Sequence, residues 1–220
     1  MKIVYLIAGI ALLLKILIIP NPLFDAEEMD IVETIVTESG VPNAVSGVIF
    51  RNRLYDTIFE VVVFTIAILG VQYLFADETP SNKVYQFTDE PSIVLARLAA
   101  MITALVAIEL AIRGHLSPGG GFAAGVAGGT AIGLIVITSS IDSIEKIYKK
   151  YNAAKWEKII VIAFILLAGI TLTGFELPMG ELGTLISGGM IPIFNILVAL
   201  KVALGSWAII LLFIRYRGLL

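Results

Sequence analysis

Blocks of about 20 mainly apolar residues recur along this chain, and such a block folds into a helix that can cross the ~30 Å hydrocarbon layer of a bilayer. Charged residues make up only 15 % of the sequence, whereas a soluble protein has about a quarter. We therefore predict an all-α integral membrane protein with six transmembrane helices. The six segments are residues 3–19, 57–76, 93–112, 122–140, 159–174 and 192–214.

The composition also restricts the chemistry of the chain. It has no cysteine, which excludes disulfides, iron–sulfur clusters, thiolate zinc sites and cysteine nucleophiles. It has one histidine, too few for a multi-histidine metal site, and its net charge of -3 does not indicate a nucleic-acid partner. We expect no catalytic residues, no metal site and no cofactor in this chain, and no activity as an enzyme.

The distribution of lysine and arginine predicts the orientation in the membrane. Nine basic residues lie on the side that holds both termini and the segments 77–92 and 141–158, which we interpret as loops. Three lie on the side that holds the loops 20–56, 113–121 and 175–191. Because basic residues are retained on the cytoplasmic side, we predict that both the N-terminus and the C-terminus are cytoplasmic.

The long outer loop, residues 20–56, has internal structure of its own. Apolar residues recur at helical spacing between residues 29 and 36, and Gly40 ends the pattern. An almost apolar stretch follows at residues 43–50. We expect a short interfacial helix and then a partly inserted segment before the second span.

Lys201 is the ionisable residue that lies deepest in a predicted span. It stands nine residues past Pro192, which at 1.5 Å per residue is ~13 Å along the helix. Insertion of such a charge costs about 2.5–3.5 kcal/mol, so it requires a partner or a function. Two interpretations stay open: a static salt bridge to a neighbouring subunit, or a lysine that exchanges protons because burial disfavours its charged form.

Two further groups of charges lie near the predicted outer ends of spans. Glu109 and Arg113 are four residues apart and share a helix face, either as a surface pair or as a carboxylate at the mouth of an ion path. Arg53, Asp56 and Glu60 also fall on one face. They are either an N-terminal cap or a coupled set that relays protons or binds Na⁺.

A glycine-rich turn separates the third and fourth predicted spans. His115 lies in this turn and titrates near neutral pH when unperturbed, and Pro118 fixes the backbone. The alternative is a tight turn with a surface histidine. Exposed backbone N–H groups are offered by three consecutive glycines, Gly119, Gly120 and Gly121.

Glycines also recur every fourth residue on the fourth span, and we predict that this stripe packs against another helix rather than taking part in chemistry. The stripe consists of Gly121, Gly125, Gly129 and Gly133.

Two sequence blocks resemble a known family. The stretch Gly114–Gly125 is similar to the signature of the B-type subunit of Mrp-type multisubunit Na⁺/H⁺ antiporters, and Ser187–Gly189 with Phe194–Ile196 resembles a second block of that subunit. The resemblance covers residues 90–215. One departure is Asn195, where the family has an aspartate.

A second, shorter resemblance involves the N-terminal part. Residues 43–45 and 53–60 resemble the C-terminal end of the large A-type subunit of the same antiporters. The polar, proline-containing segment 77–92 lies between the two resemblances. We therefore expect a two-helix module at residues 1–80 that resembles the end of the A-type subunit, and a four-helix module at residues 81–220 that resembles the B-type subunit.

The resemblance implies a multi-pass subunit of the cell membrane that takes part in Na⁺ and proton translocation, with Na⁺ as the transported ion. Its partners would be the lipid bilayer and other antiporter-like membrane subunits of a large hetero-oligomeric complex. Archaeal membrane-bound hydrogenases and sulfane reductases contain such modules. The alternatives are an inert membrane scaffold and a self-sufficient secondary transporter; no inverted repeat supports the latter.

Overall fold

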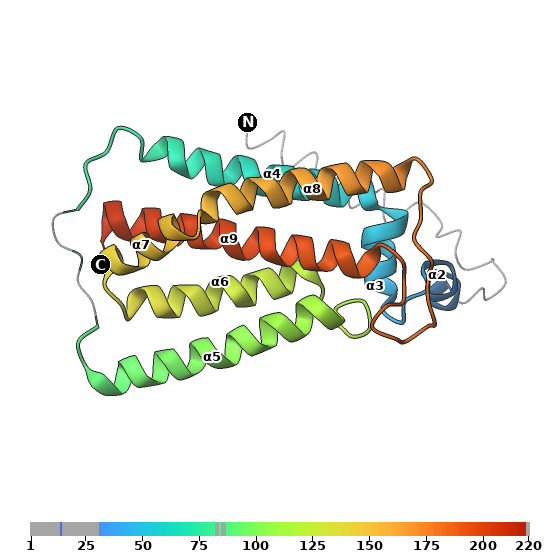
Figure 1. The fold of residues 1–220 in the computed structure, drawn as a ribbon, viewed down its shortest axis with the longest axis horizontal. Coiled ribbons are helices and arrows are strands. Elements are labelled where there is room, and N and C mark those ends of the chain that lie inside the picture. The colour runs from blue at the N-terminus through green and yellow to red at the C-terminus, as the bar shows by residue number, and fades with distance from the viewer. Residues whose placement is uncertain (1–13, 15–30, 82–83, 85–86, 219–220) are drawn as a thin grey trace. The chain divides into compact units, whose positions relative to one another are not determined.

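The computed structural model is helical throughout its regular structure (Figure 1) and describes residue 14 and residues 31–81, 84 and 87–218. The chain divides into two compact units, residues 1–34 and residues 35–220, and the packing described below belongs to the second. Apart from residue 14, the predicted span at residues 3–19 lies outside the described residues.

The five predicted spans beyond residue 50 all overlap helices. Three of the described helices, α4, α5 and α9, are long and apolar enough to cross a membrane. Helix α6 is apolar but shorter, and α8 carries three charged residues in its first two turns. The bounds are Leu54–Leu74 for α4, Glu90–Arg113 for α5, Gly121–Ile137 for α6, Ala153–Leu172 for α8 and Ile191–Arg217 for α9.

Helix α9 is the central element of residues 35–220, and α4, α6 and α8 pack along it. Phe194 on α9 contacts Phe164 of α8, with ring centroids 5.4 Å apart. On the face toward α4, a methyl group at Gly205 would lie 2.5 Å from the end of the Ile68 side chain. Glycine at this position of α9 therefore allows the two helices to approach closely. Inside lipid the hydrophobic effect does not hold helices together, and close packing of this kind does so instead.

Residues 141–158, predicted to be a loop, are mostly helical, and this corrects the sequence-based expectation. Helix α7, Ile141–Lys150, leads into α8 through a break at Asn152, whose φ is +51°. Ile141 and Ile144 are buried in an apolar cluster with the end of α9. We misread an amphipathic helix as a loop because its exposed face carries many charges.

Together, α7 and α8 run antiparallel to α9 along most of its length (Figure 1). The residue numbers of the contacts rise along α7 and α8 as they fall along α9, and the contacts continue on both sides of the break at Asn152. The contacting pairs are Asp142 with Arg215, Tyr148 with Trp207, Glu157 with Lys201, and Phe164 with Phe194.

The long loop before α4 contains short helices. Helix α2, Ile31–Ser39, occupies the region where a helix was expected, and it ends at Gly40 with a φ of +67°. The stretch expected to be partly inserted forms helix α3, Ala44–Gly47, and the π-helix η2, Val48–Asn52. Asn43 caps α3 by accepting hydrogen bonds from two backbone N–H groups.

Candidate functional site

The candidate site is an ion pair buried between α8 and α9. The Nζ of Lys201 contacts Oε1 of Glu157, and the two side chains are only 1 % and 9 % exposed. Lys201 lies ten residues past Ile191, or ~15 Å along the helix axis. The ring of Phe64 on α4 lies beside the ammonium group, with its centroid 5.2 Å from Nζ. Three helices therefore enclose the pair.

A buried pair of this kind is a poor device for stability alone. Both charges lose their hydration, and their attraction offsets that loss only when the geometry is good and the partners stay together. What the pair can do chemically is change its charge state: an amine and a carboxylate in contact can exchange a proton. A cation that approaches the carboxylate would favour the neutral amine.

Of the two interpretations left open for Lys201, the one that invokes a salt bridge to a neighbouring subunit has the wrong partner, because the carboxylate comes from the same chain. Glu157 was missed because it was assigned to a loop between basic residues. The buried face of α8 carries Ile160, Phe164 and Ala168 at helical spacing. Extending that face by one turn toward the N-terminus leads to Glu157. The helical spacing of the apolar residues could therefore have identified Glu157 as a buried residue.

The opposite side of α9 faces the glycine stripe of α6. A methyl group at Gly125 would lie 2.8 Å from the carbonyl oxygen of Ala199, and one at Gly129 would lie 2.7 Å from Cβ of Ser206. At Gly133 the nearest atom is the end of Ile210, at 3.3 Å. The stripe thus brings the backbone of α6 against α9 on the side away from Glu157.

The first glycine of that stripe also makes a polar contact with α9. The backbone N–H of Gly121 donates to Oδ1 of Asn195 at 2.8 Å, and Asn195 is fully buried. Its Nδ2 has no hydrogen-bond partner within the described ranges. The amide therefore fixes the start of α6 and keeps a spare donor inside the protein.

The turn between α5 and α6 is also closed by side chains from far away in the sequence. Asn43 Nδ2 donates to the carbonyl oxygens of Gly114 and Ser117 at 2.7 and 2.8 Å, and Ser46 Oγ donates to Gly114 at 2.8 Å. The segment at the start of α3 thus holds the turn between α5 and α6 in place.

His115 lies inside this turn and is fully buried, so the interpretation as a surface histidine is wrong. Its Nε2 lies 3.4 Å from the carbonyl oxygen of Thr184, while Nδ1 has no partner among the residues that the structure describes. Burial lowers the pKa of His115 below its usual 6.5, against a smaller opposing effect of the Thr184 carbonyl. The backbone of the turn needs glycine, since φ is +145° at Gly119 and +99° at Gly120.

The other predicted charges lie away from the buried pair. Arg53 and Asp56 form an ion pair with each other. Arg113 Nη1 lies 3.3 Å from Oε1 of Glu109, with both side chains more than half exposed. Glu60 is exposed on α4. Within the described part of the chain, no ion pair connects these residues to Lys201, and no group of three metal-ligating side chains occurs.

Comparisons with known proteins agree with this helical arrangement. The model of a family described as a domain related to the MnhB subunit of Na⁺/H⁺ antiporter matches residues 91–208. An uncharacterized protein of Methanocaldococcus jannaschii is 28 % identical, over 79 % of this chain and 77 % of its own length.

Two solved structures have a similar fold. One is a chain of the membrane-bound sulfane sulfur reductase, an archaeal respiratory membrane complex. Its TM-score is 0.70 and its identity 25 %, with 97 % of this chain and 96 % of that chain covered. The other is a chain of the Mrp complex from Dietzia sp. DQ12-45-1b, with a TM-score of 0.63 and 19 % identity. The alignment covers 95 % of this chain but only 25 % of that one, so the match shows a shared fold in part of a much longer protein.

Proposed function

We propose that this chain, which belongs to the family of domains related to the MnhB subunit of Na⁺/H⁺ antiporter, is a membrane subunit of an Mrp-like cation/proton antiporter module. The match to a chain of the sulfane sulfur reductase over nearly the full length of both proteins supports a place in a respiratory complex of that kind. In this proposal the redox chemistry belongs to partner subunits. This chain contributes to Na⁺ and proton movement without catalysing a reaction itself.

The proposal includes six spans, with both termini in the cytoplasm, and two modules at residues 1–80 and 81–220. Other antiporter-like subunits would cover the exposed apolar helix faces. The surface of α5 supports this, because Ala100 is the single buried residue in that helix and most of its large apolar side chains are exposed. A helix so little buried by its own chain needs to be covered along its length by lipid or by a neighbouring subunit.

The observation that carries the proposal is the buried pair of Glu157 and Lys201. Na⁺ that approaches Glu157 would compete with the ammonium group for the carboxylate and so promote release of the proton from Lys201. By linkage, protonation of Lys201 would equally weaken binding of Na⁺. This reciprocity is what an exchanger requires. Glu60 and Glu109, which are exposed in this chain, would bind the cation before it reaches Glu157. In the complex they would lie on faces that partner subunits cover.

The test is Na⁺-dependent proton movement in membrane vesicles that contain the whole complex. Lys201→Met roughly keeps the shape of the side chain and removes its charge, and it should abolish this activity while the complex, although less stable, still co-purifies. Lys158→Met is the matched control, because Lys158 is an exposed lysine that directly follows Glu157 on α8. Full activity of Lys201→Met would show that the pair is structural and that the chain is a scaffold for ion movement elsewhere.

A further inference from the structure

A pocket of about 440 Å³ lies between the end of α4, α7, the start of α8 and the second half of α9. Most of its surface is apolar, but six of its twelve lining residues have polar side chains that can hold water. Because one water occupies about 30 Å³ in the liquid, the pocket has room for several. The polar residues are Gln72, Glu145, Tyr148, Lys149, Arg215 and Tyr216.

The inner wall of the pocket points toward the buried ion pair. Ala154 lines the pocket and precedes Glu157 by three residues on α8. Ala208 also lines it and follows Lys201 by seven residues on α9. Both spacings place the two residues on the same helix face. The faces that form the pocket are therefore the faces that carry the pair.

Tyr148 is the lining residue of the pocket that interacts electrostatically with Glu157. Its ring packs edge-to-face on Trp207 of α9, with centroids 5.1 Å apart, and this contact fixes its orientation. Burial raises the pKa of Tyr148, and the negative charge of Glu157 raises it further. The hydroxyl thus stays protonated, lies within electrostatic reach of Glu157, and can both donate and accept a hydrogen bond.

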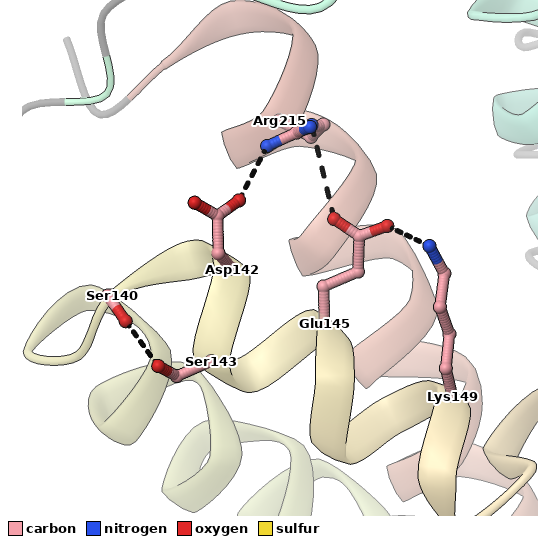
Figure 2. A network of polar contacts seen from close by, with 6 residues as sticks. All are labelled: Ser140, Asp142, Ser143, Glu145, Lys149 and Arg215. Atoms are coloured by element: carbon pink, nitrogen blue, oxygen red, sulfur yellow. Dashed lines mark hydrogen bonds and ion pairs between the residues drawn. The ribbon is translucent and has the colours of Figure 1, made fainter.

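The rim of the pocket is a network of charged side chains (Figure 2). Arg215 Nη1 lies 3.0 Å from Oδ1 of Asp142, and its Nε lies 4.0 Å from Oε2 of Glu145. Lys149 Nζ lies 2.6 Å from the other oxygen of Glu145. Pairs this exposed contribute about 0–1 kcal/mol each. These side chains can therefore rearrange and admit water at the entrance of the pocket.

We propose that this pocket is the aqueous route by which protons reach the Glu157–Lys201 pair, and that Tyr148 is the relay group at its inner end. The proposal rests on the proposed function, since it supplies protons to the pair invoked there. A hydronium ion in the pocket gives a proton to the Tyr148 oxygen and becomes water, while the hydroxyl proton passes through a bridging water to the Glu157 carboxylate. Tyr148 ends neutral, one proton has moved inward, and nothing is oxidised or reduced.

The first experiment measures Na⁺-dependent proton movement in vesicles that contain the complete complex with Tyr148→Phe. This variant keeps the contact with Trp207 and removes the hydroxyl. The rate should fall by about 100-fold or more, the loss typical of a missing proton-transfer group, while the subunits still co-purify. Tyr151→Phe is the control, because Tyr151 is exposed at the break between α7 and α8.

Comparison with Lys201→Met separates the two proposals. If Tyr148→Phe transports at the full rate while Lys201→Met is inactive, the relay is refuted and the proposed function stands. If both variants transport at the full rate, both proposals are wrong.

The second experiment tests whether water enters the pocket and does not depend on transport. Because the chain has no cysteine, Ala154→Cys provides a unique thiol on it. This thiol should react with a water-soluble methanethiosulfonate, seen as an increased mass of this chain. Ile162→Cys is the control, since Ile162 is 58 % exposed but lies on the apolar surface of α8, where no thiolate forms. Absence of reaction at Ala154→Cys would refute the aqueous route.

Discussion

Removal of one partner of the buried ion pair should destabilise the protein far more than removal of both. Glu157→Met leaves the ammonium of Lys201 enclosed by three helices, and Lys201→Met leaves a carboxylate there. With side chains only 1 % and 9 % exposed, solvent screens little, and each single change should cost about 3–5 kcal/mol. The double variant Glu157→Met/Lys201→Met buries no charge and should be close to the wild type or slightly more stable.

The assay is thermal unfolding of the purified complex in detergent, and release of this chain from the complex is the signal that is measured. For a protein of this size 1 kcal/mol corresponds to about 2–4 °C, so each single variant should lose about 6–20 °C. The double variant should recover most of that loss. Additive effects of the two substitutions would contradict the reasoning, because they would mean that Glu157 and Lys201 do not share one enclosed environment.

Three further predictions follow from other parts of the structure. Gly125→Leu should prevent assembly, because the leucine side chain would overlap Ala199 and Val202. Gly169→Leu should be tolerated, since no atom lies within 4 Å of a methyl group at that position. Normal co-purification of Gly125→Leu would contradict this prediction. Cysteine at Glu181 should react with an impermeant thiol reagent from outside intact cells and cysteine at Lys149 should not; the reverse would overturn the orientation. Burial lowers the pKa of His115 below 6.5. As the pH falls, the histidine therefore becomes protonated in the unfolded state before it does so in the folded state. Stability should therefore fall as pH drops below about 6.5, and melting curves of His115→Gln should depend less on pH.

The helices themselves were predictable because apolar length is a local property of the sequence. Each predicted span beyond residue 50 overlaps a helix, and the positions of Lys201 and the glycine stripe followed from simple spacing. The break at Asn152 was not predictable from hydropathy, because α7 is polar on one face and apolar on the other. That misassignment also concealed Glu157, the carboxylate that pairs with Lys201.

The environment of His115 depended on contacts that no local pattern reveals. Its turn is closed by Asn43, which lies 71 residues before Gly114 in the sequence and hydrogen-bonds to it. The ring itself is covered by the segment near Thr184. A histidine in a polar, glycine-rich turn is ordinarily exposed, and only the tertiary arrangement of three distant segments buries it.

In the proposed function, the Glu157–Lys201 pair moves charge rather than supporting the fold. The most direct test is uptake of radioactive Na⁺ against an imposed pH gradient by vesicles that contain the complex with Glu157→Met/Lys201→Met. The double variant is predicted to assemble with near-normal stability, which separates structure from transport. We predict that uptake driven by the pH gradient is lost in this assembled complex. Uptake at the wild-type rate would contradict it and would place ion coupling in the partner subunits.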